Sequence, residues 1–385
     1  RRFCCSVAQG FRTSEEGYPL IVSILLTLLV VLVVWFAGAR FLGGADLSRY
    51  DRSEPLAPPA RAYFSTGETP NAQHHAALKV LGELSGQTRH LPLAQRLKAL
   101  RRYMDTLSDG HALSSRFVPV NAGGVPAEWV LAPGADSSRR TLYLHGGAWA
   151  MGSPRSHRMI TSKFSELTGG AVLAIDYRLM PENPRMAGIE DCRNAYRWIL
   201  DNGPDGPQPL TALVVAGDSA GGNLTLATIA WARDQGLRPA DAAVALSPAT
   251  DGSLSGKTLK SNLASDAMLG PMFAPLTRVP RSALLWLSLL LNRIRPSNPL
   301  VSPVHGNLAN LPALLIHASE DEMLLDDAQR YQNKALAAGS SVTLQTWRHV
   351  VHVWHIFDGQ LTEAGQAFAQ IERFLNANLP ARADQ

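Results

Sequence analysis

The sequence predicts an α/β protein with a mostly parallel, doubly wound sheet. Short apolar segments typical of strands alternate with amphipathic segments typical of helices along most of the 385 residues. Hydrophobic residues make up 46% of the chain, which is ample for one large domain, and the net charge is only +4. No basic run suggests a nucleic-acid partner. Cys192 is the only cysteine outside the N-terminal tail, so the domain is expected to hold no internal disulfide.

An uncharged apolar segment near the N-terminus, Leu20 to Ala39, is long enough to cross a membrane. Its 20 residues would span roughly 30 Å as a helix, the thickness of the hydrocarbon core. We expect an N-terminal tail at 1–19 and a single transmembrane anchor at 20–39. The alternative is a signal sequence cleaved after Ala39, leaving a secreted or periplasmic protein, but the segment exceeds the usual apolar core of about 7–15 residues. Three arginines flank each end, so charge predicts no side of the membrane.

The rest of the chain is expected to form a linker and one domain. Residues 40–69 are predicted as a linker because they contain a stretch rich in Pro, Ala and charged residues. In the domain, 70–385, helical patterns at about 70–108 precede the strands. Eight strands are predicted, at 116–120, 127–132, 141–144, 171–175, 213–216, 242–246, 313–317 and 342–347. The first two are expected to pair antiparallel, and helices separate most of the others, at about 156–168, 186–201, 222–235, 324–338 and 360–377.

One segment, 251–300, does not fit this alternation. It is too long for a simple connection between two strands, so we expect an insert over the carboxyl edge of the sheet, where ligands bind in open α/β sheets. Together with the helices of about 70–112 it would form a helical cap. Its strongly apolar helix, 282–291, is expected to be a packed lid that lines an acyl pocket. The alternative is a helix that rests on a membrane surface.

A candidate nucleophile lies in the motif Gly-Asp-Ser-Ala-Gly-Gly at 217–222. An apolar strand precedes Ser219 and a helical segment follows it, which is the context of a G-x-S-x-G nucleophile elbow. The small flanking residues allow a sharp turn that exposes the serine oxygen, and the helix N-terminus favours negative charge there. The flanking strand and helix make a chance match of common loop residues the weaker interpretation.

A serine hydroxyl also needs donors for the oxyanion and an acid to orient its base. The sequence His-Gly-Gly-Ala-Trp at 145–149 follows a strand, so the backbone N–H groups of Gly146 and Gly147 are candidate donors together with that of Ala220. The acid should follow the late strand 313–317, and Asp321 is our choice. Nearby acidic residues remain open as alternatives, namely Glu320, Glu322, Asp326 and Asp327.

The base should lie after the last strand, where the sequence reads Arg-His-Val-Val-His-Val-Trp-His at 348–355. Of the three histidines, His352 is the best placed to act as the base. A metal site would use all three, but no acid of the HExxH type lies between them and their neighbours are bulky and apolar. We therefore predict no metal.

Taken together, these motifs resemble the hormone-sensitive-lipase-like family of α/β-hydrolases, especially its bacterial esterases. The matching segments are HGGAW (145–149), DYRLMPE (176–182), GDSAGG (217–222), 298–316, SEDEMLLDD (319–327) and HVWHIF (352–357). The resemblance covers roughly 70–378. It implies the α/β-hydrolase fold, a cap, Ser219 as nucleophile, Asp321 as acid, His352 as base, and an oxyanion site around Gly146, Gly147 and Ala220.

The chain departs from the family pattern at three places. Ala148 stands where a third glycine is common, Arg185-Met186 replaces an aromatic-proline pair, and Ser319 replaces a glycine before the acid. None of these changes removes a catalytic group.

The predicted function is hydrolysis of short- to medium-chain acyl esters through an acyl-enzyme, without a cofactor. Its expected partners are a small-molecule ester and a membrane, with the oligomeric state left open, a dimer included. The alternatives are a non-catalytic ligand receptor on the same fold and an acyltransferase that uses the same triad. The presence of His352 makes the receptor the weaker alternative, whereas transfer and hydrolysis share the acyl-enzyme.

Overall fold

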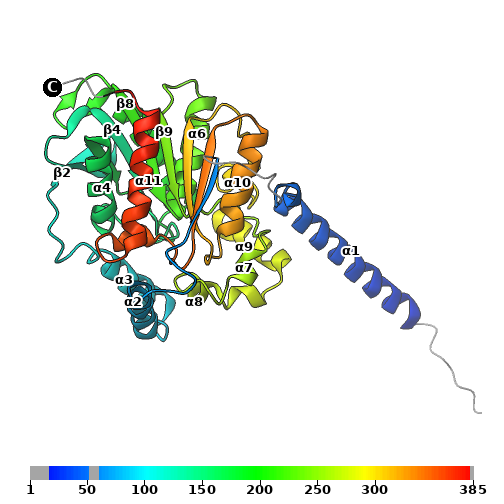
Figure 1. The fold of residues 1–385 in the computed structure, drawn as a ribbon. Helices are drawn as coiled ribbons and strands as arrows, with labels where there is room; N and C mark the ends of the chain where they lie inside the picture. Colours follow the sequence, from blue (N-terminus) through cyan, green and yellow to red (C-terminus); the bar gives the residue numbers. More distant parts are fainter. Residues whose placement is uncertain (1–16, 52–59, 382–385) are drawn as a thin grey trace, which may run out of the picture.

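A nine-stranded, mostly parallel sheet runs through the domain of the computed structural model, which describes residues 17–51 and 60–381 (Figure 1). Most of the predicted N-terminal tail therefore lies outside the described residues. The strand order is β1-β11-β10-β9-β8-β4-β5-β3-β2, and only the pairs β2–β3 and β3–β5 are antiparallel. The strands are β1 (Arg61–Phe64), β2 (Arg116–Ala122), β3 (Val125–Leu131), β4 (Asp136–Leu144), β5 (Gly170–Ile175), β8 (Ala212–Asp218), β9 (Ala242–Leu246), β10 (Ala313–Ser319) and β11 (Val342–Trp347). A separate hairpin pairs β6 (Asn202–Gly203) with β7 (Gly206–Pro207).

The sheet has one strand more than the eight predicted. β1 lies in the segment 40–69 that we predicted as a linker, and it pairs in parallel with β11 at the edge of the sheet. The prediction of a linker is therefore wrong at these four residues. A four-residue strand beside a Pro-rich stretch has too short a pattern to be recognised. In the structure it pairs with β11, and Phe64 stacks on Trp347 with ring centroids 4.5 Å apart.

Helices cover both faces of the sheet, as a doubly wound fold requires. On one face, α5 (Arg185–Asp201), α6 (Ala220–Asp234) and α10 (Leu325–Ala337) bury side chains such as Ile189, Leu224 and Leu325 in a large core cluster. On the other face, α4 (Arg158–Thr168) and α11 (Thr362–Asn378) bury Phe164 and Phe368 in a second cluster. The predicted α/β-hydrolase architecture is confirmed.

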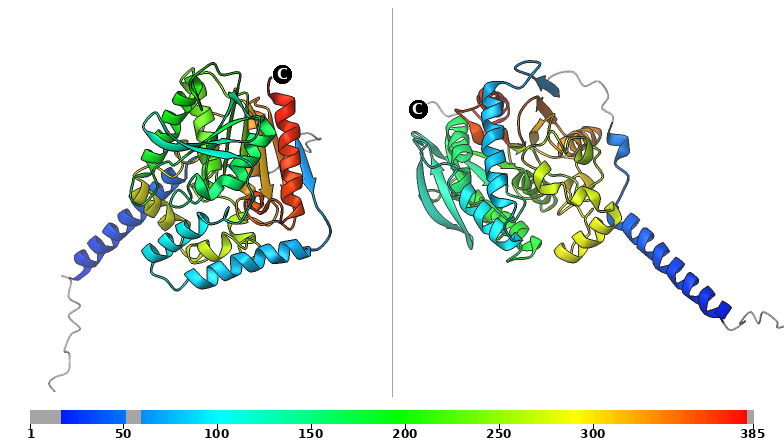
Figure 2. Two further views of the ribbon diagram at one scale, coloured as in Figure 1. Left: turned by 90° about the vertical axis from the view of Figure 1, so that its left-hand side faces the viewer. Right: turned by 90° about the horizontal axis from the view of Figure 1, so that it is seen from below.

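Further helices lie at the end of the domain where the parallel strands end (Figure 2). They are α2 (Ala72–Thr88), α3 (Leu93–Met104), α7 (Thr258–Ser261), α8 (Gly270–Phe273) and α9 (Arg281–Asn292). The first two lie between β1 and β2 in the chain, and the other three belong to the 251–300 insert. α9 is the predicted lid helix, and it packs mainly on the N-terminal helix α1 rather than on the other cap helices.

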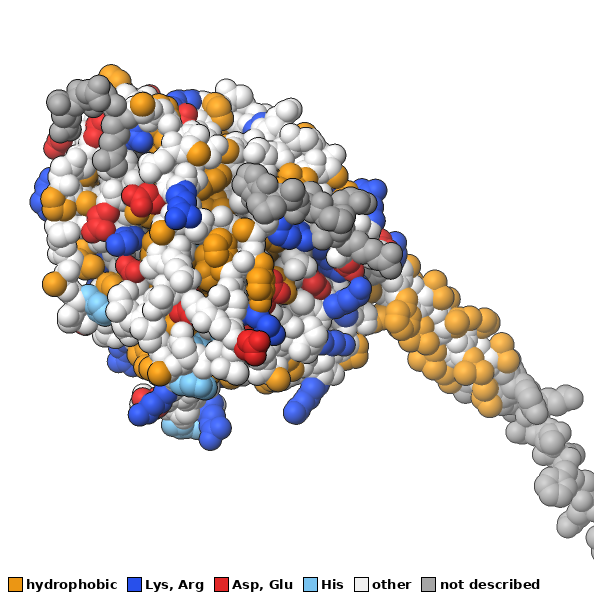
Figure 3. Space-filling model, in the orientation of Figure 1, with side chains coloured by type: hydrophobic (Ala, Val, Ile, Leu, Met, Phe, Trp, Pro, Cys, Tyr) orange, Lys and Arg blue, Asp and Glu red, His pale blue; other side chains and the backbone are white. Residues whose placement is uncertain are grey.

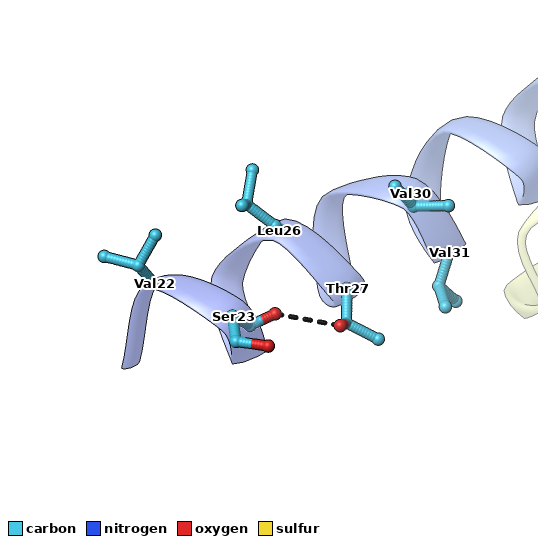
Figure 4. A pocket seen from close by; sticks show the side chains of 6 residues that line it. All are labelled: Val22, Ser23, Leu26, Thr27, Val30 and Val31. Carbon is cyan, nitrogen blue, oxygen red and sulfur yellow. Dashed lines mark hydrogen bonds between the residues drawn. The ribbon is translucent and has the colours of Figure 1, made fainter. Parts of the chain in front are cut away.

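α1 (Gly17–Gly43) projects away from the domain as a long, straight helix (Figures 1 and 3). Its side chains from Ile21 to Phe36 are almost all exposed and apolar, and its length and composition suffice to cross a membrane. Figure 4 shows one flank of this helix, where the Thr27 hydroxyl donates a 2.8 Å hydrogen bond to the Ser23 carbonyl. That hydroxyl is therefore satisfied without water.

Candidate active site

Ser219 occupies a strained turn between β8 and α6. Its φ of 53° and ψ of −115° lie outside the regions that non-glycine residues normally adopt, a conformation that costs about 1–3 kcal/mol. The backbone N–H of Ser219 donates a 2.7 Å hydrogen bond to the carbonyl of Leu246 and so ties the turn to the next strand. Gly221 must be glycine here, because a Cβ would lie 1.9 Å from the Leu144 carbonyl oxygen. The turn has the geometry of a nucleophile elbow.

His352 connects Ser219 to a buried carboxylate. Its Nε2 lies 2.9 Å from the Ser219 Oγ, and its Nδ1 lies 2.7 Å from Oε2 of Glu322. His352 follows β11 and is 2% exposed, while Glu322 follows β10 and is 1% exposed. The ends of three parallel strands thus bring a hydroxyl, an imidazole and a carboxylate together in the order that nucleophilic catalysis requires.

The acid in this arrangement is Glu322, not the predicted Asp321. Oδ2 of Asp321 instead accepts a 2.7 Å hydrogen bond from the backbone N–H of His349, so this carboxylate supports the loop that carries His352. Consecutive side chains in the turn point in different directions, and only the second of the two faces the imidazole. The Ser319 N–H holds the other oxygen of Glu322 at 3.2 Å, which orients the carboxylate.

Burial and the carboxylate act in opposite directions on His352. Burial alone would lower the pKa of the imidazole, but the hydrogen bond and the negative charge of Glu322 outweigh it, so the pKa of His352 is raised above its usual 6.5. Burial also raises the pKa of the Glu322 carboxyl. Because the two groups are 2.7 Å apart, they titrate as a coupled pair.

The other two histidines of the predicted trio have different surroundings. His349 is half-buried, and its Nε2 lies 3.1 Å from the carbonyl of Glu68. His355 is buried, with its Nε2 3.0 Å from Nδ1 of His317. Burial lowers the pKa of His355 well below its usual value and that of His317 to about 3, so both are neutral core residues at physiological pH. No group of three metal-ligating side chains occurs within the described residues.

The loop at 145–149, called the oxyanion loop below, follows β4 and differs from the prediction at one position. The Gly146 N–H, a predicted donor, already donates a 3.0 Å hydrogen bond to Oδ1 of Asp218. The backbone N–H groups of Gly147 and Ala148 have no acceptor in the described part of the chain. Ala220 opens α6, so its N–H has no acceptor within that helix. Gly147 and Ala220 thus keep the free donors that were predicted, and Gly146 has a supporting position instead.

Asp218, in the motif at 217–222, supports the site in a way that we did not predict from the sequence. It is 3% exposed, and besides Gly146 it accepts a 2.6 Å hydrogen bond from the Tyr143 hydroxyl. Nε2 of His157 lies 3.3 Å from its other oxygen. Burial would raise the pKa of Asp218, but the neighbouring His157 and the hydroxyl lower it, so the carboxylate is charged. The residue directly before the serine therefore fixes the oxyanion loop to the nucleophile turn.

Arg185 also braces this region, at a position where the sequence departs from the family pattern. Its guanidinium lies 3.4 Å from the ring centroid of Trp149, and it donates a 3.0 Å hydrogen bond to the side chain of Asn223. Burial lowers the pKa of Arg185 to about 9. No carboxylate lies within ion-pair distance of it among the described residues. Arg185 therefore joins the oxyanion loop to the helix behind Ser219.

Comparisons with known proteins agree with this geometry. Residues 141–356 match the family described as alpha/beta hydrolase fold. The chain is 39% identical to an acetyl-hydrolase of Streptomyces hygroscopicus over 256 residues, which is 66% of this chain and 81% of the relative. It is 35% identical to the carboxylesterase/phospholipase LipF of Mycobacterium tuberculosis over 263 residues, which is 66% of this chain and 68% of the relative.

Solved structures of esterases are similar to this chain as well. An esterase from the bacterial hormone-sensitive lipase family superposes with a TM-score of 0.70 at 33% identity, covering 81% of this chain and all of its own. A structure of the esterase EstE5 soaked with p-nitrophenyl butyrate superposes with a TM-score of 0.68 at 35% identity, covering 80% of this chain and 99% of its own. The chain therefore belongs to the α/β-hydrolase family, among the esterases of the hormone-sensitive lipase type, and is a serine hydrolase of carboxylic esters.

Proposed function

We propose that this enzyme hydrolyses short- to medium-chain acyl esters with Ser219 as nucleophile, His352 as base and Glu322 as the orienting acid. The observation that carries the proposal is the hydrogen-bonded chain from the Ser219 hydroxyl through the imidazole to the buried carboxylate. The chain-length range is supported by the acetyl-hydrolase and by the neighbour soaked with p-nitrophenyl butyrate.

The reaction follows from the positions of these groups. The Ser219 Oγ attacks the ester carbonyl while Nε2 of His352 takes its proton, and the charge of Glu322 stabilises the imidazolium that forms. The N–H groups of Gly147 and Ala220 are the proposed donors to the oxyanion. His352 then gives its proton to the departing alcohol, which leaves an acyl group on Ser219. Water, deprotonated by His352, attacks this acyl-enzyme, and the imidazolium returns the proton to the Ser219 Oγ as the acid leaves.

Replacement of the nucleophile tests the proposal. Ser219→Ala should abolish hydrolysis of p-nitrophenyl acetate and butyrate and abolish labelling by a fluorophosphonate, while the circular dichroism spectrum stays unchanged. Ser341→Ala, at an exposed serine directly before β11, is the matched control and should behave as wild type. Full hydrolysis by Ser219→Ala would refute the assignment, and a wild-type protein that binds esters without hydrolysing them would point to a receptor. Ester products formed with competing alcohols would reveal an acyltransferase.

We further propose that α1 is an uncleaved membrane anchor. The alternative cleavage site after Ala39 lies inside the helix, and Ala39 and Leu42 are buried against Leu285 of α9. Cleavage there would remove part of this packed junction. Mass spectrometry of the protein from membranes should find residues 20–39 intact, whereas a chain beginning at Arg40 would show that the segment is a signal sequence.

A further inference from the structure

α9 and the end of α1 form a close-packed junction outside the catalytic core. Leu285 is 2% exposed and packs against Ala39 and Leu42, with Leu289 at the margin. Gly38 is required for this approach, because a Cβ on it would lie 2.3 Å from the ring of Trp286. The junction is therefore a specific contact that holds α9 at one end of the proposed membrane helix.

The opposite face of α9 leaves large leucine side chains uncovered. Leu287, Leu290 and Leu291 are 46%, 73% and 66% exposed, at the three- and four-residue spacing that places them on one side of the helix. Phe36 and Phe41 of α1 are 62% and 65% exposed beside the junction. These side chains continue the apolar surface of α1 onto the catalytic domain. An apolar patch of this kind marks a surface that is covered in the working protein.

The residues around this patch fit the interface of a bilayer rather than its centre or the surface of a second protein. The Trp35 and Trp286 rings lie 5.8 Å apart, and tryptophan gathers at the level of lipid headgroups. The Arg295 guanidinium lies 4.8 Å from the ring centroid of Phe41. Residues 271–300 contain four arginines and no acidic residue, a charge that complements anionic headgroups. They are Arg278, Arg281, Arg293 and Arg295.

The insert that carries α9 is also bonded to the loop of the catalytic acid. The Asn262 side chain donates hydrogen bonds to the carbonyls of Glu320 and Glu322, and the Ser265 hydroxyl donates one to the carbonyl of Asp321. Seen from below in Figure 2, α9 lies beside the end of α1 and on the same side of the domain as the cap helices. A membrane contact at α9 thus places the cap side of the catalytic domain toward the lipid.

We propose that α9 lies in the interface of the bilayer that α1 crosses, with Leu287, Leu290 and Leu291 inserted below the headgroups, and that the enzyme takes esters dissolved in that bilayer. This inference rests on the proposed esterase activity and on the proposed anchor. From the sequence we expected this helix to be a packed lid, with a helix on the membrane surface as the alternative. The structure favours the alternative, because α9 packs on α1 and exposes its leucines.

Site-specific fluorescence on the full chain tests the location of α9. Single cysteines replace Leu290, Leu25 in the middle of α1, and Asp205, which lies between β6 and β7 near the start of β4, at the end of the parallel strands opposite to Ser219. Cys4 and Cys5 are changed to serine, and Cys192 is buried and does not compete for the label. Each protein carries an NBD label and is reconstituted into vesicles of phosphatidylcholine and phosphatidylglycerol, with or without brominated acyl chains.

Brominated lipid should quench NBD at positions 25 and 290 and leave position 205 unaffected. Quenching at position 25 but not at 290 would overturn the placement of α9 and leave the anchor standing. Absence of quenching at position 25 would overturn the anchor and this inference with it, without bearing on ester hydrolysis. Shielding at position 290 that depends on protein density and not on brominated lipid would reveal contact with a second copy, which also overturns the inference.

Activity provides the second readout. Leu290→Ser/Leu291→Ser should lower hydrolysis of a medium-chain ester dissolved in the vesicles by about tenfold, because two apolar contacts with lipid are lost. Hydrolysis of water-soluble p-nitrophenyl acetate should stay unchanged. Tyr63→Ser, which removes an exposed apolar side chain from the edge strand β1 and not from the cap, is the control and should alter neither rate. Equal rates on the lipid-dissolved ester for the double variant and wild type would refute the proposed route of the substrate.

Discussion

Neutralising Glu322 distinguishes the two adjacent carboxylates that follow β10. Glu322→Gln keeps the shape of the side chain and removes its charge, while Asp321→Asn makes the same change one residue earlier. The structure places only Glu322 against the base, with its Oε2 2.7 Å from Nδ1 of His352. Asp321 is bonded to the backbone of His349 instead. We therefore expect the two variants to differ strongly in catalysis.

The size of the effect follows from the charge that develops on His352 in the transition state. Two unit charges about 4 Å apart attract each other by about 4 kcal/mol at an effective dielectric constant of about 20. Loss of that attraction lowers kcat/KM by about a thousandfold. Asp321→Asn removes no charge near the imidazole, so its kcat/KM should stay near that of wild type, with at most about 1 kcal/mol of stability lost. Glu322→Asp keeps the charge one methylene further away and should fall between these limits.

The assay is steady-state hydrolysis of p-nitrophenyl butyrate as a function of pH. In wild type the acidic limb of kcat/KM reports the pKa of His352, which the charge of Glu322 raises. Glu322→Gln should therefore shift the residual limb to lower pH, a change that simple misfolding would not produce. A thousandfold loss in Asp321→Asn together with near-normal activity in Glu322→Gln would refute the assignment.

Three further predictions concern the groups around the triad. Activity should be lost as the pH falls through the pKa of His352, with a midpoint above 6.5, because only the neutral imidazole can take the serine proton; a midpoint well below that value would contradict the shift. Asp218→Asn should lower the free energy of unfolding by about 3–5 kcal/mol in calorimetry, because it breaks a buried charge pair, and should lower kcat because a neutral amide oxygen holds the Gly146 N–H more weakly than a carboxylate does. Arg185→Met should reduce kcat about tenfold by freeing Trp149, with little change in the melting temperature, since no buried carboxylate is left unpaired; normal kcat would show that the brace is dispensable.

The sequence was sufficient for the parts of the site that strand ends position. Ser219 and His352 each follow a strand that can be recognised by its apolar run, and parallel strands deliver their carboxyl ends to one edge of the sheet. The spacing within 348–355 leaves three histidines, and the structure brings His352 to Ser219. Gly147 and Ala220 could be predicted as candidate donors for the same reason, because each lies shortly after the end of a strand.

The features that the sequence did not predict are those decided by contacts between distant segments. β1 is held by β11, about 280 residues later in the chain, so the sequence around 61–64 carries no sign of its partner. α9 has the composition of a lid, but it packs on α1, where Gly38 leaves room for the ring of Trp286. This packing depends on the shape of a helix that precedes α9 by about 240 residues. Local patterns predict elements, whereas partners are decided by packing.

The acid illustrates the same limit at the scale of one residue. Both Asp321 and Glu322 are carboxylates after the same strand, and chain order alone cannot separate them. The structure separates them by burial, because Glu322 is 1% exposed and must have a partner for its charge, which His352 provides. Asp321 is partly exposed and tolerates a single backbone donor. Ser319 donates its hydroxyl to the Val350 carbonyl and its backbone N–H to Glu322, so it joins the turn that carries the acid to the loop that carries His352.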